Sequence, residues 1–162
     1  MTITASSTLP VIEALERAPL IVLPLVREVS PQILRRRPAP RRWSAHEHAC
    51  HLAFVHQLFF DRLEQILRDP HPMITPYLPD QADPDDLLMK MDLNQSLEQY
   101  VTDRARLVAR IRGLTPEEWN RTAEHQEYSD YSVYIMFRHV ALHDFLHAYR
   151  IEELLLKKDW SE

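Results

Sequence analysis

The sequence predicts an all-α protein, a four-helix bundle with a metal site between its second and fourth long helices. A single glycine, Gly113, occurs in 162 residues, and the hairpins and tight βα turns of sheet proteins usually need more. Four long segments repeat apolar residues at helical spacing. Near the C-terminus, His139, His143 and His147 recur every four residues and so share one helical face. The length fits one domain, residues 1–162.

The composition is that of a soluble globular protein. Hydrophobic residues make up 45% and charged residues 27% of the chain, and 19 basic against 24 acidic side chains give a net charge of −5. This balance argues against nucleic acid as the main partner. The arginine-rich run Arg35–Arg42 could contact phosphate, but a solvated connecting loop is the favoured interpretation.

Cysteine usage and the lack of targeting segments point to the cytoplasm. Cys50 is the only cysteine, so no internal disulfide can form. The N-terminus lacks a basic-then-apolar signal pattern. The apolar segment 20–26 is short and contains Pro24, so it cannot span a bilayer. We therefore expect a cytoplasmic protein with no membrane partner.

The first helix is predicted from Thr8 to Val29. Its apolar residues recur at helical spacing; they are Val11, Leu15, Ala18, Val22, Leu25 and Val29. Pro19 and Pro24 should kink or split this helix, because proline removes a backbone donor and clashes with the preceding turn. A connection rich in proline and arginine follows over residues 30–42.

The second helix has the clearest start, because Ser44 followed three residues later by Glu47 forms a capping box. Its apolar stripe consists of Leu52, Val55, Phe59, Leu63 and Ile66. Proline-rich sequence ends the helix, and residues 70–83 are predicted as a loop. A short helical turn is expected to start at Asp83-Pro84.

The third helix is predicted over residues 92–112, and Gly113 stands where a terminal residue with positive φ is expected. Thr115 caps a short helix, and residues 125–130 are predicted as a loop. The fourth long helix is predicted over residues 132–158. Its stripe is Met136, Val140, His143, His147, Ile151 and Leu154. Two histidines thus occupy positions where a plain core would have leucine.

A shared metal ion is the favoured explanation of these histidines. His51 faces inward on the second helix, opposite His143 and His147 on the fourth. Neutral imidazoles packed together without an ion leave donors and acceptors that are hard to satisfy, whereas catalytic zinc commonly takes three protein ligands and keeps one open position. His56 lies about 140° around the helix from His51 and cannot serve the same ion. His46 is expected on the outer side.

Other side chains near this site also have predicted roles. Glu47 or His48 is the candidate for moving a proton at the catalytic centre. His139 is a fourth ligand, a contact at the bundle's end or, as we prefer, the hydrogen-bonding partner behind a ligand. Asp144 is expected at the surface or behind a ligand. Cys50 is expected to be a small buried apolar residue rather than a nucleophile.

Two other metal schemes fit the sequence poorly. The chain contains no Glu-x-x-His, the repeated motif of di-iron carboxylate bundles. The segment from His143 to His147 resembles the His-Glu-x-x-His of zinc peptidases, but Asp144 replaces the glutamate and is one methylene shorter. A peptidase is therefore a weak alternative.

The chain resembles the DinB-like superfamily, which includes DinB and YfiT-like proteins. The resemblance rests on two motifs: Trp43-Ser44 followed by His51-Leu52-Ala53, and the segment from Arg138 to His147 followed by Ile151. It runs through much of the chain and implies the four-helix bundle derived above.

The resemblance also implies a ligand set and an assembly. The ligands would be His51, His143 and His147, holding a divalent zinc, nickel, iron or manganese ion. A homodimer is implied as well. Apolar residues that lie off the predicted core stripes are candidates for its interface; they are Phe54, Phe60 and Phe145.

The leading hypothesis for function is a metal-dependent hydrolase of a small-molecule substrate, in which the open position of the ion binds water. An alternative, implied by the resemblance, is an S-transferase or isomerase that uses a low-molecular-weight thiol. Arg150, or else Arg62, would then bind carboxylates of that cofactor. A further alternative is a non-catalytic, metal-stabilised bundle for binding or stress response, with His139 completing a closed ligand set.

Overall fold

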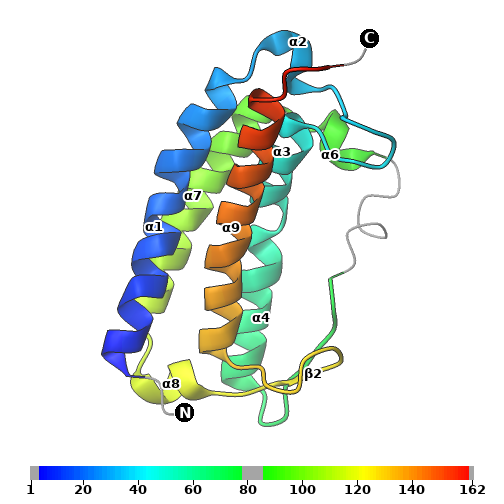
Figure 1. Cartoon of the computed structure of the whole chain (residues 1–162). Coiled ribbons are helices and arrows are strands. Elements are labelled where there is room, and N and C mark those ends of the chain that lie inside the picture. Colours follow the sequence, from blue (N-terminus) through cyan, green and yellow to red (C-terminus); the bar gives the residue numbers. More distant parts are fainter. Residues whose placement is uncertain (1–3, 78–85, 161–162) are drawn as a thin grey trace.

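The computed structural model describes residues 4–77 and 86–160. Its helices are α1 (Ala5–Glu28), α2 (Pro31–Leu34), α3 (Ala45–Phe54), α4 (His56–Arg68), α6 (Leu87–Lys90), α7 (Leu93–Arg112), α8 (Pro116–Asn120) and α9 (Val133–Leu155). Two short strands, β1 (Met73–Ile74) and β2 (Glu124–His125), pair in parallel. The predicted all-α four-helix bundle is confirmed: α1, the rod made of α3 and α4, α7 and α9 form it (Figure 1).

The order and direction of the helices decide which side chains meet. α1 packs against α7 and α9, and α3 packs against the same two helices. α1 and α9 run in one direction, whereas α3, α4 and α7 run in the other (Figure 1). Because α4 and α7 are parallel, the chain must return along the bundle between them. The neighbouring pair that matters for the histidines is α3 and α9.

The prolines of the first helix were predicted to kink or to split it, and they do not split it. α1 is one helix although Pro10, Pro19 and Pro24 all lie inside it, so the predicted split does not occur. Each proline removes one backbone hydrogen bond. The buried stripe that includes Leu15 and Val22 packs on the rest of the bundle, and tertiary packing supplies most of the stability of a helix in a protein.

The second rod was predicted as one continuous helix, and this is wrong at one residue. Val55 ends α3 and precedes α4. Its backbone N–H still donates to the carbonyl of His51, 3.1 Å away. The interruption is therefore confined to one turn, and α4 continues roughly along the direction of α3 (Figure 1).

Other boundaries also differ from the prediction. Gly113 has a φ of −85°, so the expected positive φ is wrong: its N–H donates to the Arg110 carbonyl, and the helix ends in a right-handed turn that needs no glycine. α9 ends at Leu155 and not at residue 158. The predicted loop 125–130 begins with a strand residue of β2. The turn expected at Asp83-Pro84 lies outside the described residues.

Two apolar clusters fill the bundle, and a polar layer lies where they meet. One cluster contains Leu107 and Ala141, and the other contains Tyr100 and Ala148. Between these positions on α7 and α9 lie the buried Arg104 and Asp144, and His56 lies at the same level on α4. None of the described helices is long and apolar enough to cross a membrane.

Candidate metal centre

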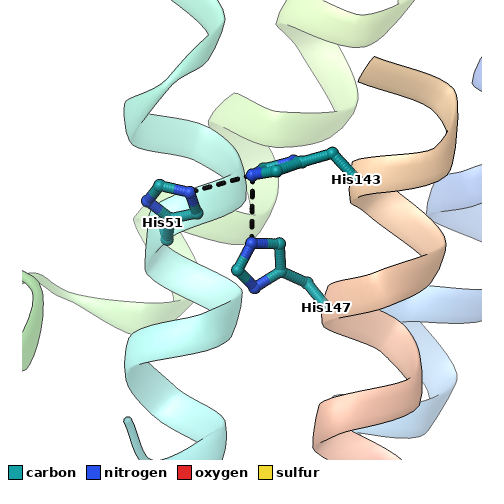
Figure 2. Close-up of side chains that lie close together, drawn as sticks. All are labelled: His51, His143 and His147. Carbon is teal, nitrogen blue, oxygen red and sulfur yellow. Dashed lines mark hydrogen bonds between the residues drawn. The ribbon is translucent and has the colours of Figure 1, made fainter. Parts of the chain in front are cut away.

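Three imidazole rings converge between α3 and α9, as the sequence predicts. His51 comes from α3, and His143 and His147 come from successive turns of α9 (Figure 2). The Nε2 atom of His143 lies 3.1 Å from Nε2 of His51 and 3.0 Å from Nε2 of His147. One ligand atom from each ring lies within 4.8 Å of the other two.

Local sequence explains why the rings face one another. Four residues advance a helix by about 400°, so His143 and His147 stand one above the other on α9. On the facing side, the predicted capping box fixes the start of α3: the Ser44 hydroxyl accepts from the Glu47 N–H at 3.3 Å, and the Glu47 carboxylate accepts from the Ser44 N–H at 2.8 Å. His51 lies two turns later on the inward face of the same helix.

The three nitrogens fit a metal ion better than they fit one another. A single Nε2 carries either one N–H or one lone pair, so His143 cannot make a good hydrogen bond to both neighbours. Ligand atoms that share an ion at bond lengths of about 2.1 Å lie roughly 3.0 to 3.4 Å apart, and the two Nε2 distances fall in this range. The donor set suits a divalent transition metal.

The electrostatics of the cluster keep its lone pairs available. Burial, reinforced by His143 and His48, lowers the pKa of His51 to about 3. Burial and the neighbouring rings His143, His51 and His48 also place the pKa of His147 far below its ordinary value. Both rings are therefore neutral at neutral pH, and a neutral imidazole is the form that binds a metal.

His48 stands directly behind one of these rings. Its Nδ1 lies 2.8 Å from Nδ1 of His147, so His147 can donate this N–H while its Nε2 points at the cluster. Burial lowers the pKa of His48 to about 4, which keeps it a neutral acceptor. The sequence proposed His48 for proton transfer and His139 for this supporting contact, but the hydrogen bond assigns the contact to His48.

Glu47, the other candidate for proton transfer, is held elsewhere. Its carboxylate accepts from the Arg37 Nε at 3.0 Å and from the Ser44 hydroxyl at 2.8 Å. Burial disfavours the charged carboxylate, but these hydrogen bonds outweigh it, and the pKa of Glu47 lies below its ordinary value. The predicted role in proton transfer is therefore replaced by a structural one, because both oxygens already serve the start of α3.

Asp144 lies beside His143 and is fully buried, so a surface position is wrong. Its carboxylate forms an ion pair with Arg104 and accepts from the Tyr100 hydroxyl at 3.1 Å. Its other oxygen lies 3.9 Å from Nδ1 of His143. Burial alone would raise the pKa of Asp144, yet the charge of Arg104 holds it below its ordinary value. A permanent carboxylate thus lies behind His143.

The remaining residues of α3 follow the prediction only in part. Cys50 is buried, as expected. His46 is buried as well, so its predicted outer position is wrong. Its Nε2 lies 3.1 Å from the Leu88 carbonyl, because α6 covers this side of α3. His56 is directed away from the cluster, with its Nε2 3.3 Å from a guanidinium nitrogen of Arg104, as its helical angle requires.

A cavity of about 310 Å³ opens beside the three histidines, all of which line it. Aromatic side chains make up much of its wall: Trp43, Phe59, Tyr77, Tyr128 and Tyr131. The partly exposed ring of His139 also lines it, and no hydrogen bond in the described part of the chain joins His139 to the triad. The tyrosines were not predictable from the sequence, because they lie in loops that carry no periodic pattern.

The two candidate arginines lie in different places. Arg62 lines the cavity together with the histidines and is 9% exposed. Arg150, which the sequence favoured, lies in a separate groove of about 910 Å³ with His48 and Lys157. It forms an ion pair with Glu153 at 2.6 Å. Arg150 is therefore not part of the wall of the cavity beside the three histidines.

Part of the arginine run Arg35–Arg42 is tied into the fold. Arg35 bonds the Met89 carbonyl. Arg37 pairs with Glu47 and with Asp86. These contacts agree with a connecting segment that packs on the protein.

Comparison with known proteins identifies the family. The model of the DinB superfamily matches residues 14–151, a segment that contains all three histidines. Among solved structures, YfiT from Bacillus subtilis is similar, with a TM-score of 0.86 and 22% identity over 98% of this chain and 91% of that chain. YfiT is described as a probable metal-dependent hydrolase with an unusual four-helix bundle topology. A comparison with curated proteins found no match. Since the family model covers most of its length, the chain belongs to the DinB superfamily.

Proposed function

We propose that this protein is a metal-dependent enzyme of the hydrolase type that acts on a small-molecule substrate. One observation carries the proposal: the Nε2 atoms of His51, His143 and His147 meet at the wall of a cavity large enough for a ligand. The description of YfiT as a probable metal-dependent hydrolase agrees with it.

The three histidines would hold the ion, and zinc, nickel, iron and manganese all accept imidazole ligands. When bound, such an ion polarises a substrate carbonyl or lowers the pKa of water. His48 holds the ring of His147 by its Nδ1. Asp144 lies behind His143. Aromatic side chains form much of the wall beside these rings.

His139 is the residue that we assign to proton transfer. It lines the cavity. Burial, followed by the charges of His143 and Arg62, lowers the pKa of His139, so its ring is neutral at neutral pH and can accept a proton. Glu47 and Asp144 are less suitable, because each is already held by an arginine.

One observation also favours a second function, transfer of a low-molecular-weight thiol. The carboxylates of Glu47 and Asp144 are held by Arg37 and Arg104, so neither is available to activate water. A thiol ionises near pH 8.5 and more readily at a metal, so its activation needs no carboxylate. The cavity rather than Arg150 would then receive the thiol.

Both functions can be tested in one experiment. The protein is stripped with a chelator, reloaded with zinc, nickel, manganese or ferrous ion, and assayed for hydrolysis of ester and amide panels and for thiol consumption with electrophiles. We expect hydrolysis that requires the metal and disappears in His143→Ala, while the exposed-site control His71→Ala retains it. Metal-dependent thiol consumption without hydrolysis would favour the transferase. Turnover that survives loss of the metal would contradict both.

A further inference from the structure

We propose that Arg62 is an anion-binding residue of the cavity, and that the substrate is a small molecule with an apolar body and a carboxylate. This inference rests on the proposed function, because it names the kind of substrate that would reach the three histidines. Four features of the described residues support it: the place of Arg62, its free donors, the lack of an acidic partner, and the chemistry of the surrounding wall.

Arg62 lies on α4, about two turns beyond the interruption at Val55, and its side chain lines the same cavity as the triad. One guanidinium nitrogen donates to the Thr75 carbonyl at 2.6 Å. The guanidinium carbon lies 5.9 Å from the centre of the Phe59 ring. Arg62 also forms a side-chain hydrogen bond with Tyr131. A guanidinium has five N–H donors in a planar fork, so these two contacts still leave donors for a ligand.

The charge of Arg62 is uncompensated within the described part of the chain. Arginine is rarely buried unless it is paired. The other deeply buried arginine, Arg104, follows this rule through its ion pair with Asp144. Arg62 is also buried, yet no described aspartate or glutamate forms an ion pair with it. A carboxylate on a ligand would supply the missing partner in a bidentate geometry.

The charge of Arg62 reaches the other groups that face the cavity. After burial, Arg62 is the largest cause that lowers the pKa of His125, and it also contributes to the lowered pKa of His139. Of the described residues that line the wall, one is an acid, Glu127, whose backbone N–H donates to Nδ1 of His125. Among the described residues of this wall, Arg62 is the permanently charged cation.

The rest of the wall indicates the polarity and size of the ligand apart from its carboxylate. Apolar and aromatic side chains form it, among them Trp43, Val55, Leu58, Tyr77 and Leu146. A volume of about 310 Å³ lies at the lower end of the range for ligand pockets and corresponds to about ten water volumes. The cavity therefore fits a compact carboxylic acid with one ring or a short branched chain.

The test uses matched acids and amides on the full chain. Arylalkanoic acids from benzoate to 4-phenylbutyrate, and the corresponding primary amides, are titrated by calorimetry into wild type, Arg62→Gln, Arg62→Lys and Arg68→Gln. Arg68 is the control, because it is exposed on the same helix. We expect at least one acid to bind wild type and Arg68→Gln about tenfold or more tightly than its amide. Arg62→Gln should lose this preference, and Arg62→Lys should keep part of it.

A carboxylate can also bind a metal, so the titrations are repeated with His143→Ala. If Arg62 recognises the acid, the preference over the amide persists in His143→Ala and disappears in Arg62→Gln. The opposite pattern would place the carboxylate on the metal and overturn the inference while leaving the metal site intact. Equal binding of acid and amide by wild type, or no binding of any acid in the series, would overturn it as well. Failure of the proposed function would be seen separately, as absence of metal-dependent turnover.

Discussion

At the scale of single residues, the three ligands differ in what holds the nitrogen that points away from the cluster. Nδ1 of His147 has His48 at 2.8 Å. Nδ1 of His143 has an Asp144 oxygen at 3.9 Å, beyond ordinary hydrogen-bond length. Nδ1 of His51 is buried without a hydrogen-bond partner. Because such partners fix the ring and raise its basicity, His147 should be the best-oriented ligand of the three.

Removal of His48 should therefore weaken metal binding without abolishing it. In His48→Ala the His147 ring loses its only described hydrogen-bond partner on Nδ1. We expect metal affinity to fall about 10- to 100-fold, less than in His147→Ala, as measured by competition with a chromogenic chelator. His71→Ala, at an exposed site, is the control. An affinity equal to that of wild type would show that His48 does not position the ligand.

His56 should make stability depend on pH. Burial, followed by the charge of Arg104, lowers its pKa from 6.5 to about 4 in the folded protein. The unfolded chain therefore binds the proton more readily. The contribution of neutral His56 is complete above pH 6.5 and is lost progressively as the pH falls towards 4.

Urea unfolding of metal-free protein at pH 7 and pH 5 measures this contribution. His48 and His51, whose pKa values are also lowered, add to the loss in wild type, so the comparison is made with His56→Gln. The drop in unfolding free energy from pH 7 to pH 5 should be smaller in His56→Gln by about 2 kcal/mol. Equal drops in the two proteins would mean that folded His56 titrates near its ordinary pKa.

At the scale of elements, the start of α3 sets the position of His51. The capping box of Ser44 and Glu47 is buried and is reinforced by Arg37. A second capping box, formed by Thr115 and Glu118, opens the short exposed helix α8. The same motif thus occurs once near the candidate site and once far from it, which provides a matched comparison.

Loss of the first cap should affect the metal site, and loss of the second should not. Both Ser44→Ala and Thr115→Ala should lower the free energy of unfolding by about 1 kcal/mol, with the larger loss for Ser44 because it is buried. Metal affinity should fall only in Ser44→Ala, because this change loosens the first turn of α3, the helix that carries His51. Thermal denaturation and chelator competition give the two readouts. Similar metal affinities in both variants would show that the cap of α3 does not position the metal site.

Helices were predictable from the sequence where local signals are strong. The capping residues Ser44 and Thr115 and the apolar stripes locate the four long elements. The interruption at Val55 was not predictable, because no proline or glycine marks it. The right-handed end at Gly113 also differs from the prediction. Of the kink or split predicted for the first helix, the split does not occur, since packing on neighbouring helices stabilises α1.

The metal triad was predictable from the sequence, whereas the partners of its rings were not. Spacing of four residues on α9 and an inward position on α3 are enough to bring His143, His147 and His51 together. The partners of these rings depend on long-range packing. His48 meets His147 across 99 residues, and Arg104 meets Asp144 across 40, so sequence periodicity could not assign His48 or exclude Glu47.

At the scale of the whole molecule, the site is built on a polar layer between two apolar clusters. Arg104 connects three long helices through Asp144 on α9, His56 on α4 and the Leu15 carbonyl on α1. The parallel direction of α4 and α7 allows this arrangement while leaving α9 beside α3 (Figure 1). The predicted homodimer and its cytoplasmic location remain predictions.

The Arg104–Asp144 pair should be costly to break but not essential to folding. Asp144→Asn leaves the buried Arg104 without its counter-charge, and we expect the unfolding free energy to fall by about 3–5 kcal/mol. The double variant Arg104→Met, Asp144→Leu removes both charges and should recover much of that loss. Chemical denaturation of the single and double variants provides the measurement. A single variant as stable as wild type would show that the pair contributes little to the bundle.

The proposed metal centre requires His51, His143 and His147 to bind one divalent ion jointly. The most direct measurement is elemental analysis of the protein after loading and gel filtration, for wild type, the three single alanine variants and the control His71→Ala. The account predicts about one equivalent of metal in wild type and in His71→Ala, and a large loss in each triad variant. Unchanged metal content in folded His51→Ala, His143→Ala and His147→Ala would contradict it.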